Sequence, residues 1–142
     1  MALWGITDAD EAKPKWLTSA EKADVYATDR GWVKLNGKGL EEVICSIGGL
    51  ATSVGGADIN TSAFVGSAFD VSAGGNVDVR LTFNEKVTVT GSPTITITNS
   101  QAGGGSAATK TATYQSGSGT NKLVFRCTIG AAGSTVSADD VL

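Results

Sequence analysis

The sequence contains no histidine among its 142 residues. Histidine is the usual general base near neutral pH and a common metal ligand, so its absence excludes Ser-His-Asp and Cys-His nucleophilic sites and histidine-bound metals. Most hydrolase chemistry is thereby removed from consideration. We therefore expect a protein that is not an enzyme and that carries neither a metal ion nor a cofactor.

Clusters of basic residues and long apolar runs are also missing. The net charge is −3, and the 11 Lys and Arg residues are scattered, which disfavours nucleic acid and anionic membranes as partners. No apolar run reaches the roughly 18 residues of a membrane span, and the N-terminus lacks the basic and apolar stretches of a secretory signal. We expect a soluble protein.

Cysteine is scarce. Cys45 and Cys127 are too few for a disulfide scaffold and do not have the spacing of a zinc site. Two reduced thiols in the core are the favoured interpretation, and a single Cys45–Cys127 bridge is the alternative.

What the sequence does have differs between its two parts. All three tryptophans, Trp4, Trp16 and Trp32, lie within the first 32 residues, whereas the later part is rich in Gly and Thr. We expect an all-β protein with three segments: an N-terminal arm and small β-meander at residues 1–50, a Gly-rich connector at 51–62, and a β-sandwich at 63–142.

The N-terminal segment carries local signals for a short helix and three strands. Thr18 and Glu21 fit a capping box, which predicts one or two helical turns. Residues 25–28 and 32–34 flank a turn that ends in Gly31, as in a β-hairpin. A third strand is expected at 41–47, with Val43, Cys45 and Ile47 on one face. So small a meander should need a support, either the rest of the chain or another protein.

Alternation of apolar and polar residues dominates the later part. It is clearest at residues 77–83, which are expected to continue as a strand at 87–89 after a polar break, and at 122–129, where Cys127 falls on the inward face. Shorter alternating segments occur at 94–98 and 111–114. Four or five strands separated by Gly, Ser and Asn predict an antiparallel sandwich.

Two segments of this part resemble a known family. Leu81 to Ile97 reads LTFNEKVTVTGSPTITI, and Ala112 to Phe125 reads ATYQSGSGTNKLVF. Both are similar to the bacterial Ig-like repeats of large surface proteins, and the resemblance covers residues 75–142. It implies an Ig-like β-sandwich.

The N-terminal fifty residues resemble a different family. The motifs are MALWG at 1–5, DEAKPKWLT at 10–18, VYAT at 25–28, GWV at 31–33 and EVICSIGGL at 42–50. They are similar to small structural proteins of cyanophages and other marine tailed phages. Together the two resemblances imply a decoration protein on the capsid surface, made in the host cytoplasm, with the major capsid protein as its partner.

Large aromatic side chains in the arm and meander are the candidate docking residues. Tryptophan is enriched among the residues that contribute most to interfaces, and Trp4 and Trp16 either fold back on the meander or insert into a partner. The five residues expected to dock are Leu3, Trp4, Trp16, Tyr26 and Trp32. Other copies of the chain and cell-surface glycans are further candidate partners. The alternatives to a capsid role are an adhesive module that binds glycans through the Ig-like face, and a structural role in the tail or neck.

Overall fold

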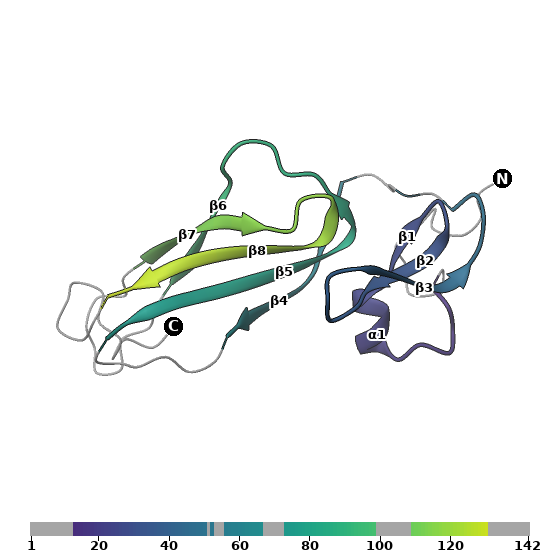
Figure 1. Cartoon of the computed structure of the whole chain (residues 1–142), viewed down its shortest axis with the longest axis horizontal. Helices are drawn as coiled ribbons and strands as arrows, with labels where there is room; N and C mark the ends of the chain where they lie inside the picture. The colour runs from purple at the N-terminus through teal and green to yellow at the C-terminus, as the bar shows by residue number, and fades with distance from the viewer. Residues whose placement is uncertain (1–12, 51, 53–55, 67–72, 99–108, 131–142) are drawn as a thin grey trace. The chain divides into compact units, whose positions relative to one another are not determined.

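The computed structural model describes residues 13–50, 52, 56–66, 73–98 and 109–130, and these form an all-β fold with one short helix (Figure 1). The all-β prediction is confirmed. The strands form a three-stranded sheet in the order β1-β2-β3 and a five-stranded sheet in the order β4-β5-β8-β7-β6. The elements are α1 (Ser19–Asp24), β1 (Tyr26–Thr28), β2 (Gly31–Leu35), β3 (Glu41–Ser46), β4 (Ile59–Val65), β5 (Gly75–Val87), β6 (Thr94–Thr98), β7 (Thr109–Ser116) and β8 (Thr120–Ile129).

The helix and the first hairpin form where the local signals predict them. Thr18 caps α1: its hydroxyl oxygen accepts the Glu21 N–H at 3.3 Å, and the Glu21 carboxylate accepts the Thr18 N–H at 2.9 Å. In the hairpin, the Thr28 hydroxyl donates to the Gly31 carbonyl at 2.9 Å and accepts the Arg30 N–H at 3.2 Å. The capping box and the turn are confirmed.

The third strand is confirmed within one residue, but its expected face is wrong at one position. Cys45 lies opposite Trp32 and Val43 lies opposite Val33, so Ile44 is an extra residue in β3. Such a bulge interrupts the alternation of side chains between the two faces. Ile44, Cys45 and Ile47 therefore pack against the core, whereas Val43 is 40% exposed.

Alternation along β8 is confirmed. Its inward side chains are buried at every second position, namely Asn121, Leu123, Phe125, Cys127 and Ile129. β7 contributes Ala112 to the same core and Tyr114 packs edge to face on Phe125, with ring centroids 6.0 Å apart. On the exposed side, Arg126 pairs with Asp78 of β5 at 2.7 Å.

The strand expected at 77–83 continues to Val87 without the expected polar break. β5 continues through the polar residues Asn84 and Glu85, which are only 3% and 8% exposed. Asn84 is satisfied there because its N–H donates to the Asp58 carbonyl at 3.0 Å and its side-chain oxygen accepts the Asp58 N–H at 2.9 Å. These bonds join β5 to the residue that precedes β4, so the polar break does not end the strand.

The expected connector at 51–62 contains the first residues of a strand, β4. All described strands after residue 58 pair in one sheet, so the Ig-like sandwich stays a prediction. The chain divides into two compact units: residues 1–62 with 81–88 and 117–122, and residues 63–80 with 89–116 and 123–142. This division differs from the expected segments because the end of β5 and the start of β8 pack with the N-terminal residues.

Within the first unit, the start of β8 and the end of β5 support the three-stranded sheet and its helix. The Asn121 side chain, which is fully buried, donates to the Asp24 carbonyl at 3.2 Å and to the Phe83 carbonyl at 3.3 Å. Lys122 pairs with the Asp24 carboxylate at 3.0 Å. The meander was expected to need support from the rest of the chain or from another protein, and the structure shows support from the rest of the chain. No helix in the described ranges is long and apolar enough to span a membrane.

Candidate functional site

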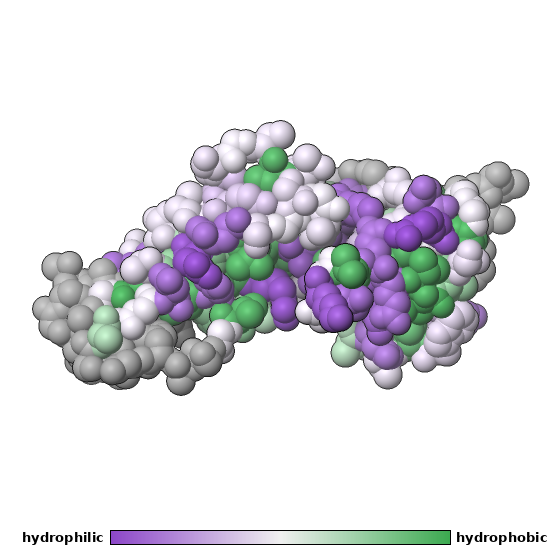
Figure 2. Space-filling model, in the orientation of Figure 1, coloured by the Kyte–Doolittle hydropathy of each residue, from purple (hydrophilic) through white to green (hydrophobic). Residues whose placement is uncertain are grey.

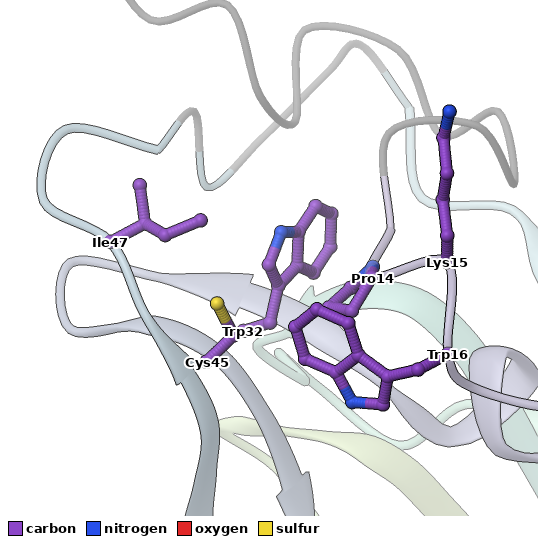
Figure 3. Close-up of a pocket in the computed structure, with 6 residues that line it drawn as sticks. All are labelled: Pro14, Lys15, Trp16, Trp32, Cys45 and Ile47. Atoms are coloured by element: carbon purple, nitrogen blue, oxygen red, sulfur yellow. The ribbon is translucent and has the colours of Figure 1, made fainter.

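An apolar pocket lies in the first unit, on the three-stranded sheet and the segment that precedes α1. It has a volume of about 240 Å³. Figure 3 shows the Trp32 indole in its middle, with Cys45 and Ile47 on one side and the Pro14–Trp16 segment on the other. Figure 2 shows apolar residues gathered over the three-stranded sheet, with polar residues around them.

The segment before α1 is held in place by its own hydrogen bonds. The Lys13 side chain, only 2% exposed, donates to the Lys22 carbonyl at 2.7 Å. The Leu17 N–H donates to the Pro14 carbonyl at 3.2 Å and so closes a turn over residues 14–17. Leu17 packs against the core, and this turn leaves the Trp16 side chain directed outward. Residues 13–15 were expected to lie at the end of an extended arm. From Lys13 onward, this segment is instead packed on the sheet.

Trp16 is the most exposed large apolar side chain of the described residues, at 69%. Of the two alternatives for this residue, this exposure favours insertion into a partner over folding back on the meander. An aromatic ring of this size costs free energy in water, because apolar area is worth about 25 cal/mol per Å² when buried. Its position at the rim of an apolar pocket marks a surface suited to a partner.

Trp32 forms the base of the pocket. It is 2% exposed and belongs to the core cluster with Val25, Ala27 and Leu50. Its indole Nε1 is buried, and no hydrogen-bond acceptor for it is found in the described part of the chain. A buried N–H without an acceptor costs about 1–3 kcal/mol. The pocket is thus lined almost entirely by apolar surface.

The five residues expected to dock lie in different surroundings. Leu3 and Trp4 lie outside the described residues. Trp16 and Trp32 both line the pocket. Tyr26 is fully buried and does not line it; its hydroxyl donates to Glu41 at 3.0 Å instead. The docking role of these residues stays a prediction.

Four lining residues, Pro14, Lys15, Cys45 and Ile47, were not among the expected docking residues. Pro14 lies two positions before Trp16, and a Pro-x-Trp turn is a usable local signal. Cys45 is on the third strand and Ile47 directly follows it, and the pairing of that strand with Trp32 is a long-range contact that the sequence pattern alone does not reveal.

Both cysteines are free thiols in the structure, as the favoured interpretation predicts. They differ in surroundings: Cys127 is 3% exposed, and burial raises the pKa of its thiol, whereas Cys45 is half-buried and lines the pocket.

A thiol reagent should therefore distinguish the two cysteines in the native protein. Reaction requires the thiolate and access to it, and burial of Cys127 removes both. We expect slow labelling at Cys45 only, and labelling of both after denaturation, measured by mass spectrometry of peptides. Labelling of Cys127 at the same rate as Cys45 would contradict the burial described here.

A network of charged side chains surrounds Glu41, the first residue of β3. Glu41 forms ion pairs with Arg30 and with Lys86 of β5, the second at 2.5 Å, and it accepts the Tyr26 hydroxyl. Lys86 also lies 5.9 Å from the centre of the Tyr26 ring. The hydrogen bond from Lys86 is the main reason that the pKa of Glu41 is lowered. Burial, with the Glu41 contact, raises the pKa of Tyr26.

This network should make the free energy of unfolding depend on acid pH. A carboxylate whose pKa is lower in the folded than in the unfolded state stabilises the fold above its unfolded pKa and loses that contribution as the pH falls through the folded pKa. We expect stability to decline as the pH falls below 4.5, the ordinary value for Glu41, and Glu41→Gln to reduce that decline. Urea titrations across the acid range measure this, with Glu42→Gln, an exposed neighbour, as the control. Equal pH dependence of the wild type and Glu41→Gln would contradict it.

The described residues contain no group of three or more Cys, Asp or Glu side chains that could hold a metal ion. Comparison of the chain with models of known families, with curated proteins and with solved structures gave no match.

Proposed function

We propose that the chain is a structural protein of a phage virion, most simply a capsid decoration protein, that docks on the shell through the apolar pocket of its first unit. The observation that supports this proposal is the exposed Trp16 beside the pocket over Trp32. The N-terminal resemblance to phage structural proteins supplies the class of partner, and the pocket supplies the place of contact.

The chemistry of the pocket defines what a partner must present. Its walls come from Pro14, Trp16, Trp32 and Ile47, so the inserted group is an apolar side chain. A loop of a shell protein with an exposed aliphatic residue presents such a group.

Burial of Trp16 supplies part of the free energy that attachment needs. A tryptophan offers about 200 Å² and 69% of this side chain is exposed, so burying the exposed part at about 25 cal/mol per Å² contributes about 3 kcal/mol before the entropy of association is subtracted. Many copies on one shell would hold without covalent links. In this proposal the docking role belongs to the first unit, and the Ig-like segment takes no part in it.

Proteomics and cryo-electron microscopy of the source particle test the proposal together. We expect peptides of this chain in purified particles and density for its three-stranded sheet at repeated positions on the capsid, with Trp16 against the shell. Density confined to the tail or neck would reject the decoration role and retain a structural one. Absence of the chain from purified particles would reject both and favour the adhesive alternative.

A further inference from the structure

β4 is an edge strand that lacks the usual protection against pairing with another strand. Its neighbour in the sheet is β5, and among the described strands it has no neighbour on its other side. All seven of its residues are exposed, including Ile59 at 56%, Phe64 at 58% and Val65 at 37%. The sequence INTSAFV has no charge and no proline, the residues by which proteins commonly block such edges.

The other three edges of the two sheets are better protected. β1 has only three residues, and β3 begins with two glutamates and contains a bulge. β6 has five residues and follows Pro93 directly. Short length, charge, bulges and proline all discourage the addition of a strand. β4 is thus the edge at which a further strand would add most readily.

The backbone groups that face outward from β4 follow from its pairing with β5. Asp58 and Asn84 bond through their backbones, since the Asn84 N–H donates to the Asp58 carbonyl. In an antiparallel ladder, alternate residues direct their N–H and C=O groups to the same neighbour. Residues 58, 60, 62 and 64 therefore face β5, and Ile59, Thr61, Ala63 and Val65 direct their backbone groups outward.

We propose that β4 pairs with β4 of a second copy of this chain, antiparallel and symmetric about Ser62, to form a dimer with one continuous sheet. This register places Ile59 opposite the partner's Val65 and Thr61 opposite the partner's Ala63. All four outward-facing residues of each strand are then in hydrogen-bonded pairs, which gives about eight bonds across the interface. The two Ser62 residues meet on the twofold axis.

The residues of β4 are better suited to pairing with β4 of a second copy than with an arbitrary strand. Self-pairing places apolar Ile59 against apolar Val65 twice, and cross-strand pairs of this kind stabilise a sheet. No charged residue lies in the strand, so the twofold axis brings no like charges together. The surface is distinct from the Trp16 pocket, so the inference goes beyond the docking role proposed above.

Two matched proline variants test the dimer. Thr61→Pro removes an outward N–H and blocks the second strand without removing a bond to β5, because proline is tolerated at the outer side of an edge strand. Thr96→Pro is the control on the opposite edge, β6. There the Tyr114 N–H donates to the Pro93 carbonyl, so alternate residues from 94 on, including Thr96, face away from β7.

Sedimentation of the full chain should show a mass of twice 14.3 kDa for the wild type and for Thr96→Pro, and the monomer mass for Thr61→Pro. Ser62→Cys gives a second readout that also reports register. Facing residues in a non-hydrogen-bonded pair have Cα atoms about 4.5 Å apart, which suits a disulfide. We expect oxidation to link the Ser62→Cys dimer far more than Thr96→Cys or the wild type.

Three results would overturn the inference. One is a wild-type monomer at concentrations up to about 1 mM, the weak end of specific association. Another is a dimer that persists unchanged in folded Thr61→Pro. The third is Ser62→Cys cross-linking no greater than that of Thr96→Cys, which decides the matter if Thr61→Pro does not fold.

Discussion

Replacement of Gly31 by alanine should destabilise the three-stranded sheet by about 4 kcal/mol or more, which is at the severe end for a single substitution. Gly31 has a φ of +120°, which residues with a side chain rarely adopt. A Cβ at this position would lie 2.1 Å from the Cys45 carbonyl oxygen and 2.6 Å from the Ile47 nitrogen. The first is a backbone atom of β3 and the second is a backbone atom of the residue that follows β3, so β2 and β3 would have to separate.

Gly37→Ala is the matched control for this prediction. Gly37 lies in the next turn of the same sheet, and a Cβ there meets no atom within 4 Å. Urea denaturation followed by circular dichroism should show a small change for Gly37→Ala and a large loss for Gly31→Ala. Similar free energies of unfolding for the two variants would show that the close approach of β2 and β3 at Gly31 is wrong.

Trp32→Ala should lower the free energy of unfolding by about 3–5 kcal/mol, the range for removing a large aromatic side chain from a core. Trp32 is 2% exposed and packs with Val25, Ala27 and Leu50. Trp16→Ala should change stability by about 0.5 kcal/mol or less, because its side chain is 69% exposed. Equal losses of stability for the two variants in urea denaturation would contradict the roles assigned to them.

Local signals in the sequence predicted the elements that depend on neighbouring residues. The capping box of Thr18 and Glu21, the turn before Gly31 and the alternation along β8 each involve residues within a few positions of one another. Such contacts form in the same way in almost any surrounding structure, and all three are present as expected.

The failures come from contacts between residues far apart in the chain. Asn84 stays inside β5 because Asp58 bonds to it, and Asn121 is buried because carbonyls of Asp24 and Phe83 accept its amide. The bulge at Ile44 reverses the expected face of Val43. Residues 59–62, the first four of β4, were assigned to the connector because they are mostly small or polar and show no alternation that a buried face would impose.

The candidate site also combines one feature that is evident locally in the sequence with others that depend on long-range contacts. Trp16 was identified because a large aromatic residue in a segment with little core of its own is conspicuous in any sequence. Its neighbours in the pocket, Cys45 and Ile47, come from β3 and from the residues after it, and they reach Trp32 only through strand pairing. The sequence pattern therefore indicates Trp16 but not the pocket beside it.

Binding of the purified full chain to shells assembled from the major capsid protein alone tests the central claim most directly. The variants are Trp16→Ala and Leu40→Ala, because Leu40 is a comparably exposed apolar residue, at 63%, that does not line the pocket. Co-sedimentation should give the same saturable binding for the wild type and Leu40→Ala, and binding about a hundredfold weaker for Trp16→Ala, as expected for loss of about 3 kcal/mol. Equal binding of Trp16→Ala and the wild type, or no binding of any of the three, would contradict docking through this pocket.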